Sequence, residues 1–506
     1  MAAGDNLYGL LRAGFADRLD QSFLVLPGAG TRTFADLDAL SATYAGVLRE
    51  LGLAAGDRAV VQIGKSPEAL ALYLACLRTG VVYIPLNTAY TSGELRHFLV
   101  DARPRVYVCP PASAEALQPV VDEANIPNVL TLDEDGTGSL AEQALVAKAA
   151  HELAPRNLDD VAAILYTSGT TGRSKGAMLT IGNLASNAQT LVKLWGWRDD
   201  DVLLHALPIF HVHGLFVALH CAMLGGSTVL FHPRFDVAAV RAALPHATVM
   251  MGVPTFYTRL LEDPDFGAAD CRNMRLFISG SAPLLASICE DFAKRTGHRI
   301  LERYGMTEAG MITSNPLDGE RVPGTVGYAL PGVDLRVCAG DADLPPGEVG
   351  DIQIRGPNVF AGYWQMPEKT AAEFTADGYL RTGDLGTLAA DGRLTLVGRA
   401  RDLIISGGYN IYPKEIERRL DELPGVRESA VIGVPHPDLG EAVVAVIVAD
   451  DNTPPDEPTL LAGLGDQLAR FKQPRRLFFV GDLPRNAMGK VEKQRLRRRF
   501  RDAFAS

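Results

Sequence analysis

The sequence contains few cysteines and no excess of positive charge. Six cysteines are scattered over 506 residues, without any Cys-x-x-Cys pair, at Cys76, Cys109, Cys221, Cys271, Cys289 and Cys338. This distribution favours buried thiols in a reducing compartment over disulfides or a zinc site. The formal net charge is −11, whereas nucleic-acid-binding proteins usually have a basic balance. The composition therefore argues against a disulfide-stapled, zinc-binding or nucleic-acid-binding protein.

Signals for membranes and export are also missing. No apolar run reaches the roughly 20 residues that a membrane-spanning helix needs. The first residues, Met-Ala-Ala-Gly-Asp-Asn, hold neither a basic leader nor an apolar core. With 47 % hydrophobic and 22 % charged residues, the composition is that of a globular protein. We therefore expect a cytoplasmic protein, and 506 residues predict more than one domain.

A stretch rich in glycines and hydroxyls runs from Tyr166 to Gly176, directly after an apolar strand predicted at 161–165. It holds five Ser or Thr, three Gly and two cations. Glycines let backbone N–H groups approach a ligand closely, while hydroxyls and cations are donors for phosphate oxygens. A polar hairpin loop is the alternative. A Walker A loop fits less well, because Ser174 precedes Lys175 and Gly176 follows it. The pattern predicts a triphosphate-binding loop of another type.

Strand-like and helix-like segments alternate in the first part of the chain. The apolar spacing predicts helices at 33–51 and 66–79 and strands at 58–63, 81–86 and 161–165. Such alternation is typical of a parallel sheet covered by helices on both faces. We therefore expect an α/β fold here.

Three later segments carry side chains suited to a ligand site. His211 and His213 follow a predicted strand at 202–207; without a third ligand nearby, a pocket-lining or structural role is favoured over a metal site. A strand from 275 ends in the small residues Ser279–Pro283, which suit a flat ligand lying against backbone. In the segment 302–308, a tyrosine could lie against a purine, and a hydroxyl and an acid could reach a phosphate and its Mg²⁺. An exposed turn is the alternative for this segment.

The last part of the chain has a different pattern. Asp384, predicted at a strand-to-turn junction, could accept ribose hydroxyls or cap the turn. Beyond about residue 400 the periods shorten, and the remaining residues, about a hundred, predict a small separate α+β domain. Lys490 lies on a glycine-containing turn and could be a mobile cation for a reacting phosphate. The basic tail from Lys490 to Arg501 is expected to be a solvated helix.

Taken in this order, these segments resemble the AMP-forming acyl-adenylate synthetases, the superfamily of acyl-CoA synthetases, luciferases and peptide-synthetase adenylation domains. His211–Gly214, Pro254–Leu261 and Asn486–Lys490 look most like malonyl-CoA synthetases. The resemblance implies an α/β fold: a large N-terminal domain of α/β-layered sheets plus a distorted β-barrel, at 1–398, and a small mobile α+β C-terminal domain at 402–506. Residues 399–401 would form the hinge between them.

The resemblance also implies roles for individual residues. Lys490, Thr307 and His211 would be catalytic, with Lys490 bridging the substrate carboxylate and the α-phosphate. Glu308 would hold Mg²⁺, Arg401 would be the hinge residue where many relatives have Asp or Lys, and Gly407 with Gly408 would wall the coenzyme A tunnel. ATP would be bound by Thr167, Ser168, Gly169, Thr170, Thr171 and Lys175 at the phosphates, Ser281, Ala282, Glu302, Arg303 and Tyr304 at the adenine, and Asp384 and Arg399 at the ribose.

The implied reaction is ATP-dependent ligation of malonate, with methylmalonate as a further acid, to coenzyme A in fatty acid metabolism. A dicarboxylate leaves a second anion in the acyl pocket, and Arg259 is the proposed partner; the rival interpretation pairs it with Glu262 or Asp263 on its own helix. His211, Ser279 and Met311 are further pocket candidates. The alternatives are a ligase for another short-chain or aryl acid, a catalytically idle nucleotide-binding protein, and an enzyme that loads a carrier protein. Acylation of Lys490 would remove its charge and switch the enzyme off.

Overall fold

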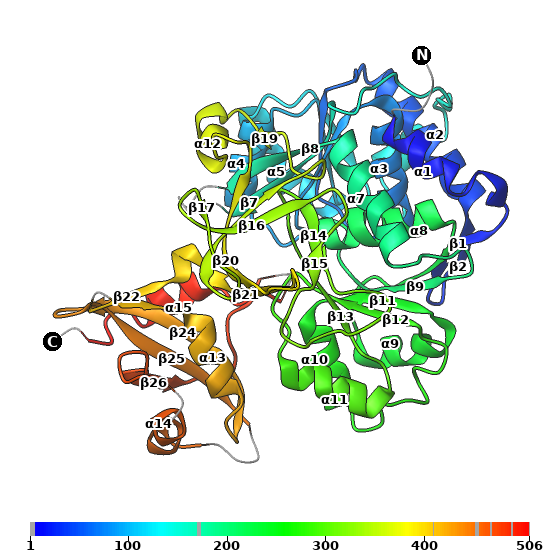
Figure 1. The fold of residues 1–506 in the computed structure, drawn as a ribbon. Helices are drawn as coiled ribbons and strands as arrows, with labels where there is room; N and C mark the ends of the chain where they lie inside the picture. The colour runs from blue at the N-terminus through cyan, green and yellow to red at the C-terminus, as the bar shows by residue number, and fades with distance from the viewer. Residues whose placement is uncertain are drawn as a thin grey trace.

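The computed structural model describes residues 6–168, 174–407, 409–450, 455–465, 468–486 and 489–504. They form a large lobe and a smaller C-terminal lobe beside it (Figure 1). The described residues build four β-sheets, of which three belong to the large lobe. The expectation of a large N-terminal and a small C-terminal domain is confirmed, and the boundary at 399–401 stays a prediction.

One sheet of the large lobe carries the glycine-rich stretch. Its strands pair in the order β19 (Gly362–Tyr363), β8 (Ser174–Thr180), β7 (Val161–Ser168), β4 (Val82–Pro85), β3 (Arg58–Val61), β5 (Val106–Cys109) and β6 (Asn128–Thr131). The strands β4, β3, β5 and β6 are parallel, and β4 and β5 are buried along their whole length. This confirms the helix-covered parallel arrangement, because only a sheet covered on both faces buries strands so completely.

A second sheet places several candidate site residues at its carboxyl ends. Its order is β15 (Tyr328–Ala329), β14 (Gly310–Ser314), β13 (Leu301–Met306), β12 (Leu276–Ser279), β11 (Val249–Gly252), β9 (Val202–His205), β10 (Thr228–Phe231), β1 (Ser22–Leu26) and β2 (Gly30–Thr33). From β1 to β13 the pairs are parallel. Ligands commonly bind outside the carboxyl ends of such strands.

The helices of the large lobe lie around these two sheets (Figure 1). Helix α3 is buried on nearly all sides, which explains why its sequence is apolar all round. The α-helices are α1 (Leu7–Ala13), α2 (Phe34–Glu50), α3 (Pro67–Thr79), α4 (Ser92–Ala102), α5 (Pro111–Glu123), α6 (Ser139–Ala144), α7 (Ile181–Leu194), α8 (His220–Gly225), α9 (Val237–Ala243), α10 (Pro254–Glu262), α11 (Ala286–Thr296) and α12 (Pro367–Glu373). A π-helix, His213–Leu219, and short 3₁₀ turns at Ala16–Arg18, Leu244–His246 and Ala400–Asp402 complete the set.

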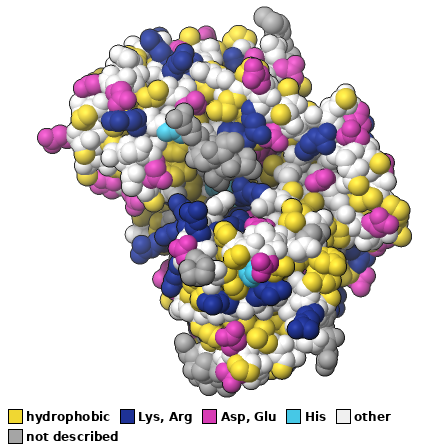
Figure 2. Space-filling view, turned by 90° about the vertical axis from the view of Figure 1, so that its left-hand side faces the viewer, with side chains coloured by type: hydrophobic (Ala, Val, Ile, Leu, Met, Phe, Trp, Pro, Cys, Tyr) yellow, Lys and Arg dark blue, Asp and Glu magenta, His cyan; other side chains and the backbone are white. Residues whose placement is uncertain are grey.

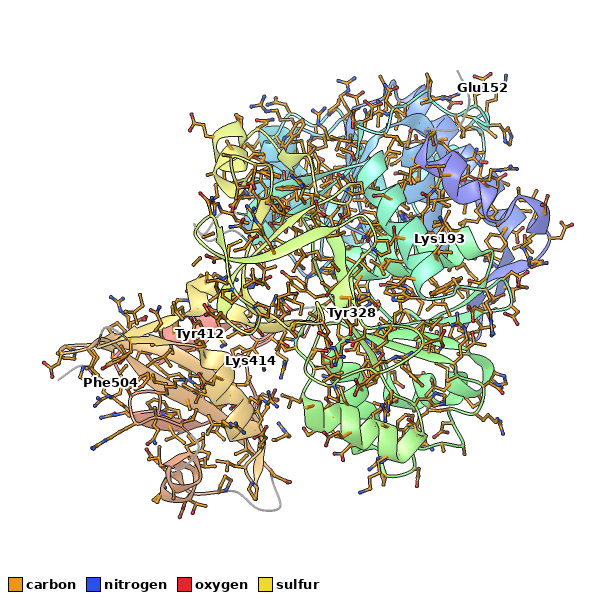
Figure 3. All side chains as sticks on the ribbon, viewed as in Figure 1. Glu152, Lys193, Tyr328, Tyr412, Lys414 and Phe504 are labelled. Carbon is orange, nitrogen blue, oxygen red and sulfur yellow. The ribbon has the colours of Figure 1, made fainter. Side chains whose placement is uncertain are left out.

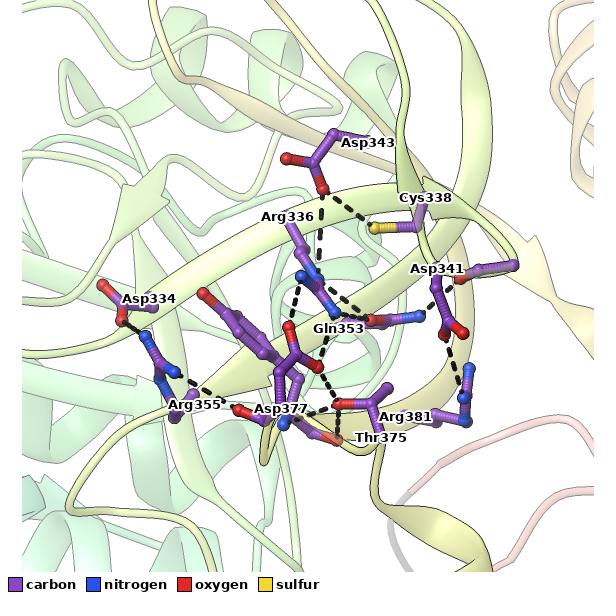
Figure 4. A network of polar contacts seen from close by, with 12 residues as sticks. Asp334, Arg336, Cys338, Asp341, Asp343, Gln353, Arg355, Thr375, Asp377 and Arg381 are labelled. Atoms are coloured by element: carbon purple, nitrogen blue, oxygen red, sulfur yellow. Dashed lines mark hydrogen bonds and ion pairs between the residues drawn. The ribbon is translucent and has the colours of Figure 1, made fainter.

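The third sheet lies where the resemblance implies a distorted barrel. It pairs β17 (Ala342–Asp343), β16 (Asp334–Ala339), β18 (Val349–Arg355), β20 (Leu380–Leu388) and β21 (Leu394–Arg399) in an open order, so no barrel closes among the described strands. A polar network covers part of this sheet (Figure 4). Arg336 donates to Asp377 at 2.8 Å and to Gln353 at 3.0 Å, and its guanidinium lies over the ring of Tyr379.

The small lobe has a sheet and a core of its own. Strands β23 (Tyr409–Ile411), β22 (Ile404–Ser406), β25 (Gly440–Ala449) and β24 (Val426–His436) pair in this order, and β26 (Arg476–Phe479) pairs with β25. Helices α13 (Pro413–Asp421), α14 (Glu457–Gly465) and α15 (Lys493–Arg499) complete the lobe. Its buried side chains form clusters separate from those of the large lobe, as expected for an α+β domain.

The structure corrects several local predictions. Strand β7 runs through Ser168 and β8 begins at Ser174, so the glycine-rich stretch connects two antiparallel strands of a hairpin. Asp384 lies within β20, not at its end. A π-helix begins at His213, where a loop was expected. The cysteines are free and buried, and no helix in the described part of the chain has the length and apolarity to cross a membrane.

Asp201 joins the amino ends of neighbouring strands in the second sheet. Its carboxylate accepts hydrogen bonds from Thr248 Oγ1 and Arg275 Nε, both at 2.7 Å, and it is fully buried. Burial alone would raise the pKa of Asp201, but the hydrogen bonds from Arg275 and Thr248 outweigh this effect and lower it. This ion pair therefore stabilises the folded state at neutral pH.

We expect Asp201→Ala to lower the free energy of unfolding by about 3–5 kcal/mol, because breaking a buried ion pair leaves the other charge unpaired. Urea unfolding followed by tryptophan fluorescence measures this, since Trp195 lies beside Arg275. The contribution of Asp201 to the free energy of unfolding is complete above its unfolded pKa of about 3.9 and is lost as the pH falls below that value. The exposed neighbour gives the control, Asp200→Ala, which should leave the transition nearly unchanged. Equal losses in both variants would contradict the assignment.

Candidate active site

The hairpin β7–β8 brings the two ends of the glycine-rich stretch together. Thr167 and Lys175 are directly paired across the two strands. Gly169, Thr170 and Thr171 lie outside the described residues, as does the side chain of Ser168. The described part thus places one hydroxyl and one buried cation side by side at the base of the predicted phosphate loop.

A buried acid lies against this base. Glu308, which follows β13, accepts hydrogen bonds at Oε1 from Thr167 Oγ1 at 3.2 Å and from Tyr363 at 3.0 Å. Lys175 Nζ lies 3.4 Å from Glu373 and 4.4 Å from the centre of the Tyr363 ring. Glu308 is 7 % exposed, which excludes the alternative of an exposed turn for this acid. Tyr363 and Glu373 were not predicted, because both come from far along the chain.

Asp384, Tyr304 and Arg399 form a second polar group. The Tyr304 hydroxyl donates to Asp384 Oδ2 at 2.6 Å, and Arg399 Nε lies 3.1 Å from Asp384 Oδ1. Asp384 and Arg399 are direct cross-strand partners on β20 and β21. The structure brings these residues together as the resemblance implies; their contacts with a nucleotide stay predictions.

Strand alternation separates Arg303 from its two neighbours. Successive side chains of a strand point to opposite faces, so Glu302 and Tyr304 share one face of β13 and Arg303 takes the other. Glu302 accepts from the Gly324 N–H at 3.2 Å, and burial raises its pKa to about 7. The charge of Lys414, which Figure 3 shows on the side of the small lobe facing the large lobe, opposes this shift.

Arg303 is a buried cation without a carboxylate partner. It is 3 % exposed, and its Nε and Nη2 have no hydrogen-bond partner within the described part of the chain. The guanidinium packs against the backbone of Gly280, where an added Cβ would lie 2.5 Å from Arg303 Cζ. Burial lowers the pKa of Arg303 to about 9, which still leaves it charged at neutral pH.

Two histidines lie beside this cation. Burial, followed by the charges of Arg303 and Lys490, lowers the pKa of His211 to about 4. Burial and then Arg303 lower the pKa of His213 as well. Both imidazoles are therefore neutral at physiological pH. Neutral imidazole can donate or accept a hydrogen bond without competing with Arg303 for an anion.

Further buried polar atoms, of β12 and of the segment around His213, have no partner in the described part of the chain. Ser279 Oγ and His213 Nε2 are buried and have no hydrogen-bond partner among the described residues. Ser281 Oγ lies 3.2 Å from His213 Nδ1, and Ser281 has a left-handed φ of +72°. Strained backbone of this kind clusters at functional sites. Ala282 follows and is half-buried. Buried polar atoms normally find partners, so this group is suited to a polar ligand.

The two remaining pocket candidates, Met311 and Arg259, differ in burial. Met311 is buried on β14, with its side chain against Gly305 of β13. Arg259 lies on the exposed face of α10, whose buried face carries Phe256, Tyr257 and Leu260. The structure therefore does not bring Arg259 to Arg303 and the histidines.

Lys490 reaches the large lobe from the small one. The turn that carries it lies against α10, where a Cβ on Gly489 would be 3.1 Å from Thr255 Oγ1. Burial, followed by the charge of Arg399, lowers the pKa of Lys490 to about 8, and Asp384 opposes the shift. Lys490 thus lies near both the Asp384 group and His211. Figure 2 shows Lys and Arg side chains gathered around the hollow between the lobes.

Arg401, the predicted hinge residue, lies within electrostatic reach of both Lys490 and Asp384. Arg401 is in the 3₁₀ turn at Ala400–Asp402, which connects β21 to β22, and Arg497 of α15 donates to Asp402 at 2.9 Å. Gly407 directly follows β22, which carries the exposed Ile405 and lies at the outer end of the small lobe (Figure 1). Gly408 lies outside the described residues. In this orientation the β22–β23 turn is not at the site.

The large lobe holds a hairpin rich in glycines and hydroxyls, and the small lobe presents a lysine to the large lobe near Asp384 and His211. This arrangement defines an enzyme that activates its substrate with a nucleotide. Comparison with protein families makes the class specific, since the AMP-binding enzyme family matches residues 14–364 and the AMP-binding enzyme C-terminal domain matches residues 415–490. The chain belongs to the AMP-binding enzyme family.

Curated relatives include ligases for different acids. Feruloyl-CoA synthase of Amycolatopsis sp is 36 % identical, covering 94 % of this chain and 95 % of that protein. Malonate–CoA ligase of Arabidopsis thaliana is also 36 % identical, covering 88 % of this chain and 78 % of that protein. Sequence identity alone therefore does not separate an aryl acid from malonate.

Solved structures bear on the orientation of the lobes. ATP-bound MatB from Rhodopseudomonas palustris is 50 % identical, covers 99 % of both chains and superposes with a TM-score of 0.96. Apo MatB from the same organism, at the same identity and coverage, gives 0.84. The structure of this chain is thus more similar to the ATP-bound form.

The lowered pKa of Lys490 predicts a pH dependence of adenylate formation. The ammonium form is needed beside anionic oxygens, so kcat/KM for ATP should fall as the pH rises through about 8, because this ratio reports the free enzyme. Pyrophosphate release between pH 6.5 and 9.5 measures it. In Lys490→Arg the guanidinium stays charged, so the fall in kcat/KM above about pH 8 should vanish even if the activity is lower. If the same fall persists in this variant, it is caused by another group.

Proposed function

We propose that this protein ligates malonate to coenzyme A with ATP, through an acyl-adenylate, giving malonyl-CoA, AMP and pyrophosphate. The observation that carries this proposal is the buried, unpaired guanidinium of Arg303. A buried charge without a partner costs several kcal/mol, and a second carboxylate on the substrate would offset this cost. An acid with a single carboxylate leaves Arg303 unpaired.

The presence of two cations near one imidazole supports a short diacid. The charges of both Arg303 and Lys490 act on the ring of His211, so the two cations flank one imidazole. One carboxylate would face Lys490 and the nucleotide, and the other would face Arg303. Ser279 and His213 offer neutral partners beside the second carboxylate. Methylmalonate adds only a methyl group between the carboxylates and is a further candidate.

The first half-reaction joins two anions. A carboxylate oxygen of malonate attacks the α-phosphorus of ATP, and the bond to the pyrophosphate leaving group breaks. The ammonium of Lys490 would neutralise charge on the attacking and transferred oxygens. Thr307, in the turn between β13 and β14, would contact the α-phosphate from the large lobe.

Glu308 fits a role in holding Mg²⁺. Its carboxylate lies beside the Thr167 hydroxyl at the base of the phosphate loop, and Mg²⁺ is usually held by one or two carboxylates together with substrate phosphates. The ion would reduce repulsion between the phosphates and the carboxylate. Lys175 and the hydroxyls of the loop would bind the terminal phosphates, and Asp384 with Arg399 the ribose.

The second half-reaction needs different groups at the same carbon. The thiol of coenzyme A attacks the carbonyl of the adenylate, and AMP leaves. We propose that the small lobe rotates about Arg401 within 399–401, so that Lys490 withdraws and the turn at Gly407–Gly408 approaches the thiol tunnel. Moving a domain avoids crowding both sets of groups into one site. The cytoplasmic location, fatty acid metabolism and acylation of Lys490 stay predictions.

We expect Lys490→Ala to lower adenylate formation from malonate and ATP by a factor of 100 or more, on the order expected for a charge that stabilises the transition state. Thioester formation from synthetic malonyl-adenylate and coenzyme A should be nearly unchanged. The two rates are measured separately, by pyrophosphate release and by thioester absorbance. Equal losses in both would refute the role of Lys490.

We expect Arg303→Met to lower kcat/KM for malonate by roughly 100-fold or more, since it removes one partner of a buried charge pair. Use of propionate, which has the same chain length and a single carboxylate, should be retained or improved. Arg259→Met is the matched control and should change malonate use little, because Arg259 is exposed. Similar losses for both acids, or a larger loss in the Arg259 variant, would contradict the assignment and favour a ligase for another acid.

A further inference from the structure

The turn that presents Lys490 is held by its own hydrogen bonds. The Asn486 N–H donates to the Lys490 carbonyl at 3.0 Å, and the Lys490 N–H donates to Asn486 Oδ1 at 3.0 Å. The Gly489 N–H donates to the Asn486 carbonyl at 2.9 Å, and Gly489 has a left-handed φ of +72°. These bonds define the shape of the turn, but they do not fix its position relative to the sheet of the small lobe.

Arg485 connects this turn to the sheet. Its Nη1 donates to the Gly489 carbonyl at 2.6 Å, one residue before Lys490, and its Nη2 forms an ion pair with Glu428. Both side chains are largely buried, with 30 % of Arg485 and 22 % of Glu428 exposed. Hydrogen bonds that involve a charged group are roughly twice as strong as neutral ones. Arg485 therefore links the backbone beside Lys490 to β24.

A β-bulge sets the direction of Glu428. On β24, Val426 is opposite Ala449 and Glu428 is opposite the next residue, Val448, so Arg427 is the extra residue of the bulge. Bulges re-aim side chains and are frequent next to active sites. Without the extra residue the side-chain alternation after it would be reversed, and Glu428 would lie on the other face of the sheet.

Glu428 also faces the large lobe. Burial raises the pKa of Glu428; Arg485 and then Arg427 oppose the shift, while Asp482 and Glu262 add to it. Glu262 belongs to α10, the helix against which the Lys490 turn lies. The charge of Glu262 therefore acts on Glu428 across the lobe boundary, and Arg485 supplies positive charge beside Glu428.

We propose that Arg485, oriented by Glu428, is a positioning residue that holds the Lys490 turn in place for adenylate formation. This proposal rests on the proposed role of Lys490 and adds the pair of Arg485 and Glu428 to it. Arg485 touches no reacting atom. Its loss would let the turn shift, and a displacement of about 1 Å from productive geometry can reduce a rate on the order of 100-fold. Thioester formation does not use Lys490 and would be spared.

The test compares the two half-reactions in full-length variants. Arg485→Met is expected to lower kcat for adenylate formation on the order of 100-fold, with little change in KM for ATP and in thioester formation from synthetic malonyl-adenylate. Glu428→Gln keeps an acceptor for Arg485 and should give a smaller loss in the same step. The double variant should be no worse than Arg485→Met, because both residues act through one link. Arg427→Met, on the adjacent exposed residue, is the matched control.

The outcomes separate the two proposals. Adenylate formation within about threefold of the parent in Arg485→Met, or equal losses in both half-reactions, would overturn the positioning role. Lys490→Ala is measured in parallel: if it lowers both half-reactions equally, the proposed role of Lys490 fails instead. Should Arg485→Met fail to fold, Glu428→Gln decides, and an unchanged adenylation rate in that variant also overturns the inference.

Discussion

The central constraint in this structure is that positive charge must be held in a partly dry cleft where anions are to meet. One such cation belongs to the large lobe and the other to the small lobe. Arg303 is buried in the large lobe against the backbone of Gly280, and Lys490 arrives on a turn of the small lobe. His211 lies near both cations, and burial, followed by the charges of Arg303 and Lys490, keeps its imidazole neutral.

Much of the fold was predictable because it depends on local patterns. Helix α3 and strand β4 lie within a residue or two of their predicted ranges, and the glycine-rich stretch lies where a phosphate loop was expected. Lys490 was identified from its turn and its place in the order of motifs. The contacts of Glu308 were not predictable, because Tyr363 reaches it through a two-residue strand that pairs with β8. Such long-range pairing leaves no local signal.

The exposed position of Arg259, the cation predicted for the acyl pocket, could have been inferred from periodicity. Phe256, Tyr257 and Leu260 mark the buried face of α10, and Arg259 falls outside it at helical spacing. Arg303 was grouped with Tyr304 as an adenine contact, although adjacent residues of a strand point to opposite faces. Family resemblance assigned both residues to one segment. Only the side-chain alternation distinguishes their directions.

The low pKa values of the two histidines have a consequence for how the pocket responds to acidity. His211 and His213 stay uncharged down to mildly acidic conditions, while Arg303 stays charged throughout. The charges of these three side chains are therefore constant across the physiological range, whereas Lys490 titrates near pH 8. Around Arg303, a change in proton concentration alters the ionisation of a dicarboxylic acid and not the charge of the side chains that surround it.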